Sequence, residues 1–87
     1  MAKVVLARRA RFELLELEWP LIDAIENALG LLERSPDAGH PLRGRLSGLR
    51  SLRIGSYRVI YQLVDDDRTA RVAAIRHRSV AYRSDRR

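Results

Sequence analysis

Alternating apolar and polar positions along residues 52–61 predict a β-hairpin. Gly55-Ser56 suits a two-residue turn, because glycine readily adopts the positive φ that the first turn position requires. Such a turn places Arg53 directly opposite Arg58, on a face that also carries Ser51, Ile60 and Gln62. The other face is apolar and holds Leu52, Ile54, Tyr57, Val59, Tyr61 and Leu63.

The facing arginines are the most informative feature of this hairpin. Like charges directly opposite each other destabilise a sheet, so their placement indicates that Arg53 and Arg58 hold an anion. The alternative is that both side chains simply turn into solvent, as arginines usually do.

Two helices are predicted before the hairpin. The first spans residues 8–17, with Phe12, Leu15 and Trp19 at helical spacing, and we expect Trp19 in the core rather than in a partner-binding or self-association surface. The second starts at Pro20, which suits a first helical turn, and ends at Ser35-Pro36. Its apolar stripe consists of Leu21, Ile25, Ala28, Leu29 and Leu32, and its acidic residues face solvent.

The remaining segments read as strands and turns. Strands are predicted at residues 4–6, 49–54, 57–64 and 69–77, and a glycine-rich loop over 37–48 has room for a short strand at 42–46. Asp65–Asp67 lacks the spacing of a calcium loop and is interpreted, together with Arg68, as a turn. Alternation along the last strand groups Val72, Ala74, Arg76 and Arg78 on one face and Arg71, Ala73, Ile75 and His77 on the other.

These elements predict a single α+β domain over residues 1–87. An N-terminal strand and a helical hairpin pack on one face of a mostly antiparallel four-stranded sheet, and residues 79–83 form a short C-terminal element. The opposite face, with Arg53 and Arg58, is expected to stay open to solvent and partners.

Charge is distributed unevenly along the chain. The net charge is +6, but residues 1–37 carry five basic and seven acidic side chains, whereas residues 38–87 carry twelve basic and four acidic ones. Sixteen of the seventeen cations are arginine, which makes forked contacts with phosphate. A basic half of this kind indicates a nucleic-acid binder. Codon composition alone would explain the preference for arginine but not its segregation.

Other chemistries find little support in the composition. The chain has no cysteine, and His40 and His77 lack metal-ligand spacing, so neither a metal nor another cofactor is expected. We find no signal-peptide-like or membrane-spanning run, and the expected location is the cytoplasm, with no membrane partner.

Several motifs together resemble the RelE/ParE superfamily of bacterial toxins. They are Pro41-Leu42, Gly44, Gly48, the run 52–61, and the ending His77-Arg78 with Tyr82-Arg83. The resemblance covers nearly the whole chain. It implies one of two activities, because RelE-like members are ribosome-dependent endonucleases that cut mRNA, whereas ParE-like members share the fold and inhibit DNA gyrase. The arginines together with Tyr82 favour the RelE-like branch.

The resemblance also implies roles for particular residues. Arg58 matches the arginine that binds the scissile phosphate, Arg78 the arginine near the end of the last strand, and Tyr82 the tyrosine that stacks on a base or transfers a proton. The expected RNA-binding residues are Arg43, Arg45, Arg50, Arg53, Arg76 and Arg83. Alternatively, Tyr82 is a packed C-terminal anchor and Arg78 a surface salt-bridge residue.

One departure from the RelE-type pattern concerns proton transfer. That pattern has lysines on the strand before the hairpin, where this chain has Ser51 and arginines. Arginine stabilises charge but is a poor general base. The residues expected to abstract the proton are then Tyr82 and His77. Alternatively, His77 has a structural role in the core.

The resemblance implies partners as well. An acidic, RelB-like antitoxin is expected to wrap the basic half, and the complex is expected to bind operator DNA mainly through the antitoxin. The ribosome and mRNA are the expected targets. The alternatives are a ParE-like gyrase inhibitor without a catalytic site, and an inactive relative or plain RNA-binding domain.

Overall fold

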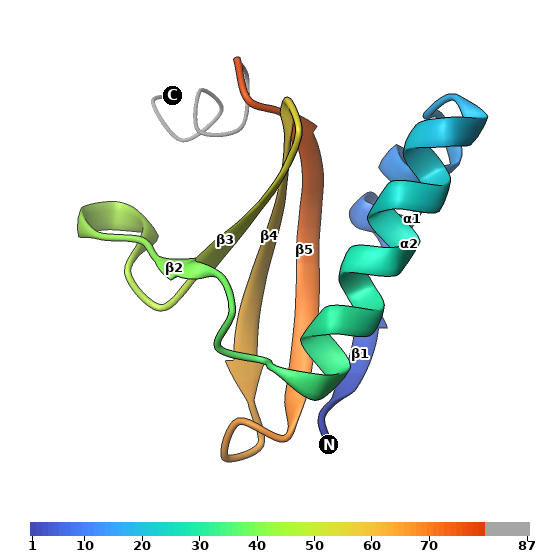
Figure 1. The fold of residues 1–87 in the computed structure, drawn as a ribbon. Helices are drawn as coiled ribbons and strands as arrows, with labels where there is room; N and C mark the ends of the chain where they lie inside the picture. The colour runs from blue at the N-terminus through green and yellow to red at the C-terminus, as the bar shows by residue number, and fades with distance from the viewer. Residues whose placement is uncertain (80–87) are drawn as a thin grey trace.

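A five-stranded sheet carries two helices on one face in the computed structural model, which describes residues 1–79 (Figure 1). The elements are β1 (Lys3–Leu6), α1 (Arg8–Leu15), α2 (Trp19–Arg34), β2 (His40–Pro41), the 3-10 helix η1 (Gly44–Leu46), β3 (Arg50–Ile54), β4 (Tyr57–Val64) and β5 (Thr69–His77). The strand order is β1-β5-β4-β3-β2, and β1 alone runs parallel to its neighbour. The α+β prediction is confirmed, with five strands instead of four. The predicted element at 79–83 extends beyond the described residues.

The hairpin between β3 and β4 has the predicted register. Ile54 pairs with Tyr57 and Arg53 pairs with Arg58. Gly55 adopts a φ of +57°, which a residue with a Cβ reaches only at a steric cost. The turn residue therefore determines which side chains of the two strands face each other.

A β-bulge between β4 and β5 changes the faces that simple alternation predicts. Ile60 pairs with Ala74, but Tyr61 pairs with Val72, so Ala73 is an extra residue on β5. Because two residues oppose one at a bulge, the alternation reverses there. Val72 consequently lies fully buried under the helices, and the predicted grouping of Val72 with Ala74 was wrong.

Helix α2 covers the sheet with the predicted stripe. Ile25 and Leu32 are fully buried, and Pro20 lies in the first turn. The helix ends at Arg34, immediately before Ser35-Pro36. These side chains join a core made of Ala10, Leu14, Val59, Tyr61, Ala70, Val72 and Ile75. Within residues 1–79, neither helix is long and apolar enough to cross a membrane.

Helix α1 presents a different face to the sheet from the predicted one. Phe12 and Leu15 of α1 are 61% and 67% exposed, whereas Ala10 and Leu14 are buried, and Trp19, which begins α2, is 75% exposed. The core role predicted for Trp19 was therefore wrong. The small Ala10 side chain suits close packing of α1 against β5, and a search for large apolar residues overlooks such a position.

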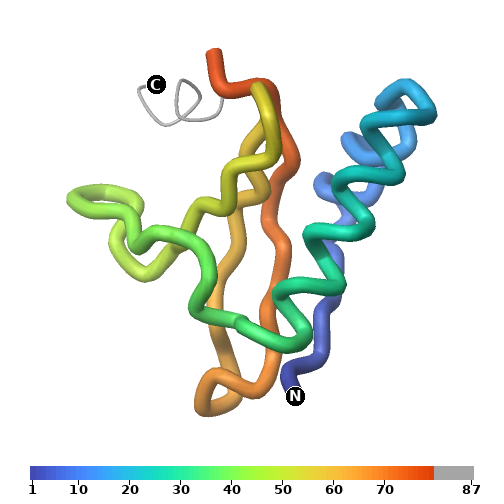
Figure 2. Tube along the Cα trace, in the orientation of Figure 1, coloured from blue at the N-terminus to red at the C-terminus, as the bar shows by residue number. Residues whose placement is uncertain are grey.

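The chain between α2 and β3 runs past the sheet to its outer edge (Figure 2). The short strand predicted at 42–46 lies earlier, at His40–Pro41, and residues 44–46 form η1. Gly44 has a φ of +64°, which is incompatible with an extended strand. The edge strand therefore ends before Leu42.

The turn predicted at Asp65–Asp67 is confirmed, and all three residues have positive φ, between 54° and 65°. Asp tolerates this region better than most residues, but only glycine avoids the steric cost. We expect Asp66→Gly to raise the free energy of unfolding by about 0.5–1 kcal/mol, as measured by urea denaturation. Asp37→Gly, outside the positive-φ positions, should lower it instead. A lower value for Asp66→Gly would contradict the assigned turn geometry.

Candidate functional site

Three arginines lie side by side on the three middle strands of the sheet, near the turn between β3 and β4. Arg58 on β4 pairs with Arg53 on β3 and with Arg76 on β5. Directly opposed residues have Cβ atoms roughly 4.5–5.5 Å apart and share a face. We call these three residues the arginine row, and their side of the sheet, away from the helices, the arginine face. The hairpin register predicted the first pair, and the bulge leaves Arg76 on the same face.

Arg58 occupies the middle of the arginine row and is half-buried. Its Nη1 atom is buried and has no hydrogen-bond partner among the described residues. A buried donor of a charged group is costly unless something accepts its hydrogen bond. Together with the flanking cations, this nitrogen makes the position suited to an anion such as phosphate.

An open cavity of about 200 Å³ lies at the β3 end of the arginine row. Its lining residues are His40, Leu42, Ser51, Arg53 and Arg58. Ser51 on β3 and Ile60 on β4 are buried, so the arginine face is less open to solvent than predicted. His40 is the residue of this site that the sequence analysis missed. It lies on β2 and pairs with Ser51 on β3. The predicted strand at 42–46 does not include His40 and therefore did not indicate this pairing.

A buried tyrosine positions the loop that carries His40. The Tyr61 hydroxyl accepts a hydrogen bond from the Gly39 N–H (2.9 Å) and donates one to the Pro36 carbonyl (2.7 Å). A Cβ on Gly39 would lie 2.8 Å from the Tyr61 ring, so glycine is needed for this close approach. We call the contacts of Tyr61 with Gly39 and Pro36 the loop latch.

Arg50, an expected RNA-binding residue, also holds this loop. Its Nε donates to the Gly39 carbonyl and its Nη2 to the Asp37 carbonyl, both at 3.1 Å. Arg50 pairs with Tyr61, so it does not share the arginine face. The structure therefore does not bring Arg50 into the arginine row.

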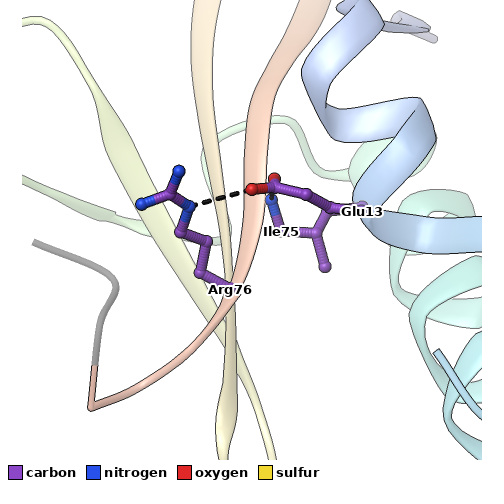
Figure 3. A network of polar contacts seen from close by, with 3 residues as sticks. All are labelled: Glu13, Ile75 and Arg76. Atoms are coloured by element: carbon purple, nitrogen blue, oxygen red, sulfur yellow. Dashed lines mark hydrogen bonds and ion pairs between the residues drawn. The ribbon is translucent and has the colours of Figure 1, made fainter. Parts of the chain in front are cut away.

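Glu13 of α1 reaches the open edge of β5 beside Arg76 (Figure 3). One carboxylate oxygen accepts the Ile75 N–H at 2.8 Å, and the other accepts the Arg76 Nε–H at 2.9 Å. Figure 3 shows the terminal nitrogens of Arg76 turned away from α1. Glu13 thus ties the helix to the arginine row. The sequence signal for this contact is that Glu13, an acidic residue, lies between Ala10 and Leu14, the two buried residues of α1.

Because this contact is partly buried, Glu13→Ala is expected to lower the free energy of unfolding by about 1–2 kcal/mol. Glu13→Gln should lose less, since its amide oxygen still accepts the Ile75 N–H. Urea denaturation measures both values. Glu26→Ala removes an exposed acid of α2 and should change stability by less than about 0.5 kcal/mol. A Glu13→Ala chain as stable as the Glu26→Ala chain would contradict this role.

The predicted residues near the C-terminal end are placed differently from the arginine row. His77 pairs with Tyr57, so it lies on the side opposite the arginine face, and their rings meet edge to face at 5.3 Å. Its Nδ1 lies 2.9 Å from the Ser79 hydroxyl. Arg78 is exposed, and its N–H donates to the Ser56 carbonyl at the hairpin turn.

The other predicted site residues fall into two groups. Arg43 and Arg45 are exposed and lie in and beside η1. Tyr82 and Arg83 lie outside the described residues, so the roles expected for them stay predictions.

Comparisons with known proteins agree with this fold. The family model of the ParE toxin of the type II toxin-antitoxin system, parDE, matches residues 4–82. Toxin RelG of Mycobacterium tuberculosis is 39% identical over 64 residues, which are 72% of this chain and 74% of that protein. Toxin RelE of the same organism is 40% identical over 60 residues, which are 68% of this chain and 62% of that protein.

Solved structures show the same architecture. The toxin-antitoxin complex RelBE2 from Mycobacterium tuberculosis contains a chain with a TM-score of 0.79 and 35% identity, and the match covers 88% of this chain and 98% of that one. The isolated E. coli RelE toxin has a TM-score of 0.74 over 99% of this chain and 98% of that one, and at 19% identity it shows the fold alone. With the family model matching nearly its full length, this chain belongs to the RelE/ParE superfamily of type II toxins.

Proposed function

We propose that this toxin is a ribosome-dependent mRNA endonuclease, which inhibits translation. The observation that carries the proposal is the buried Arg58 Nη1, which has no partner within residues 1–79 and lies in the middle of a row of three arginines beside an open cavity. The similarity to chains named toxin RelG and toxin RelE supports it. A single-stranded message presents the phosphates that such a row accommodates.

The reaction needs no metal in this proposal. The ribose 2′-oxygen loses its proton and forms a bond with the adjacent phosphorus, while the bond from phosphorus to the 5′-oxygen breaks. The 5′-oxygen leaves with a proton, which gives a 2′,3′-cyclic phosphate and a free 5′-hydroxyl. Negative charge increases on the phosphoryl oxygens as the new bond forms, and Arg58 between Arg53 and Arg76 stabilises it.

Proton transfer requires a group other than the arginine row, since arginine stays protonated. His77 lies on the other side of the sheet, which argues against its role as general base. Tyr82, outside the described residues, keeps the stacking or proton-transfer role that the family resemblance implies. Arg43 and Arg45, in and beside η1, and Arg78 are proposed to contact flanking RNA.

The proposed partner in the cytoplasm is an acidic, RelB-like antitoxin. Solved relatives of this fold are toxin-antitoxin complexes named RelBE2 and RelBE. An acidic segment over the arginine face would supply acceptors to the arginine row and block access to RNA. The complex would contact operator DNA mainly through the antitoxin.

Expressing the chain in a sensitive bacterium and mapping RNA 5′ ends tests the proposed activity. New 5′-hydroxyl ends inside coding regions are expected with the wild-type chain and not with Arg58→Ala. The matched control, Arg34→Ala, removes an exposed arginine of α2 and should leave cleavage intact. Messages that stay intact during growth arrest would overturn the proposal.

Gyrase inhibition is the second candidate, and the family model that matches, described as a ParE toxin, favours it. A gyrase inhibitor would block supercoiling by purified gyrase while messages stay intact. An inactive relative would cause neither effect and no growth arrest.

A further inference from the structure

We infer that His40 is the general base that takes the proton from the attacking 2′-hydroxyl. This inference rests on the proposed mRNA cleavage and names the proton acceptor that the arginine row itself cannot supply. Neither the motifs of the sequence nor the family resemblance pointed to this residue.

The position of His40 relative to Arg58 carries the inference. His40 pairs with Ser51 on β3, and paired residues share a face, so the imidazole lies on the arginine face. His40, Ser51 and Arg58 line the same cavity of about 200 Å³. A phosphate that Arg58 binds in this cavity would therefore lie in the space that His40 also lines.

The chemistry of the lining residues leaves His40 as the suitable acceptor among them. Leu42 carries no titratable group, the Ser51 hydroxyl is a weak base, and Arg53 and Arg58 stay protonated. Neutral imidazole accepts protons near neutral pH and is the commonest general base in enzymes. The charged groups that line the cavity with His40 are Arg53 on β3 and Arg58 on β4.

In the proposed step, a ring nitrogen of His40 takes the proton of the 2′-hydroxyl as the 2′-oxygen bonds to phosphorus. Arg58 binds the phosphoryl oxygens, and the bond to the 5′-oxygen breaks. The leaving 5′-oxygen takes a proton from water, and the imidazolium later returns its proton to solvent. The loop latch keeps His40 at the cavity, because Gly39 immediately precedes it.

Single-turnover cleavage of a message on programmed ribosomes tests the assignment with two variants. His40→Gln removes the base and is expected to slow the chemical step at saturating ribosomes by about 10²–10⁴-fold. His40→Arg places a cation in the cavity without a usable base, and we expect the same loss of rate with ribosome binding retained. The wild-type rate should rise with pH, because a general base acts in its deprotonated form, and this rise should disappear in both variants.

Rescue of cleavage by added imidazole distinguishes a general base from a residue with only a structural role, because free imidazole can replace the base but not a structural contact. His40→Ala opens space at the edge of the cavity, and we expect imidazole to restore part of its cleavage rate but none in Arg58→Ala. A His40→Arg chain that cuts within about threefold of wild type would show that His40 contributes only charge, and would overturn the assignment. If His77→Gln lost cleavage activity while His40→Gln cut at the wild-type rate, the general base would be His77 instead. A wild-type chain that leaves the message intact would overturn the proposed activity itself.

Discussion

Arg58→Ala is expected to reduce single-turnover mRNA cleavage on programmed ribosomes by about 10²–10³-fold, the effect of removing one donor that stabilises charge in a transition state. Arg58 is the middle member of the arginine row, and its buried Nη1 is the donor that an incoming phosphate would satisfy. Arg53 is exposed and Arg76 is engaged by Glu13, so neither is placed to replace it. The rate of product formation under saturating toxin measures the effect.

The same substitution is expected to leave the fold at least as stable as the wild type. Removing Arg58 relieves two like-charge contacts across the strands and one buried donor that has no partner in the described part of the chain, which together favour the variant by about 1 kcal/mol. Inorganic phosphate should raise the melting temperature of the wild type by mass action and have little effect on the variant. Arg34→Ala, the matched charge control, should respond to phosphate like the wild type. An Arg58→Ala chain that unfolds, or that cuts at the wild-type rate, would contradict the anion-site assignment.

Tyr61→Phe is expected to lower the free energy of unfolding by about 2 kcal/mol, although it deletes a single oxygen atom. That hydroxyl satisfies both the buried Gly39 N–H and the Pro36 carbonyl, and phenylalanine leaves both backbone groups without this partner. The ring itself stays in the core, so little apolar burial is lost. Chemical denaturation measures the loss of stability.

The loop latch also connects stability with the candidate site. Releasing residues 36–39 loosens β2, whose pairing with β3 consists of two residues, and with it His40 at the cavity. The rate of mRNA cleavage by the Tyr61→Phe variant should therefore be lower than that of the wild type, even at temperatures where the domain is still folded. Tyr57→Phe removes a hydroxyl from a half-buried tyrosine outside the latch and should have little effect on either property. Equal stabilities of the two phenylalanine variants would contradict the latch.

Local chemistry made most secondary structure predictable. Pro20 and Pro36 delimit α2, and the spacing of Ile25 and Leu32 marks its buried face. Gly55 determines the register that brings Arg53 opposite Arg58. These signals act within a few residues, because helix ends, turns and side-chain alternation depend on backbone geometry that each residue type restricts directly.

Packing between distant segments limited the rest of the prediction. Phe12 and Trp19 have the spacing of a buried stripe, yet α1 buries the face of Ala10 and Leu14. The bulge at Ala73 reverses the faces of β5 without any glycine or proline to signal it. Which helical face is buried, and where a ladder gains a residue, depends on how neighbouring elements fit together.

For the candidate site, the fold class, the basic half, and the facing of Arg53 and Arg58 follow from local sequence signals, since a two-residue turn sets the register of its strands. Three-dimensional packing was needed to show that Arg76 completes the row and binds Glu13, and that His77 lies on the other side of the sheet. It also decided that His40 shares a cavity with Arg58. The reason is that these contacts join residues far apart in the sequence: Glu13 binds Arg76 across 63 residues, and His40 pairs with Ser51 across 11. Local backbone preferences do not determine such pairings.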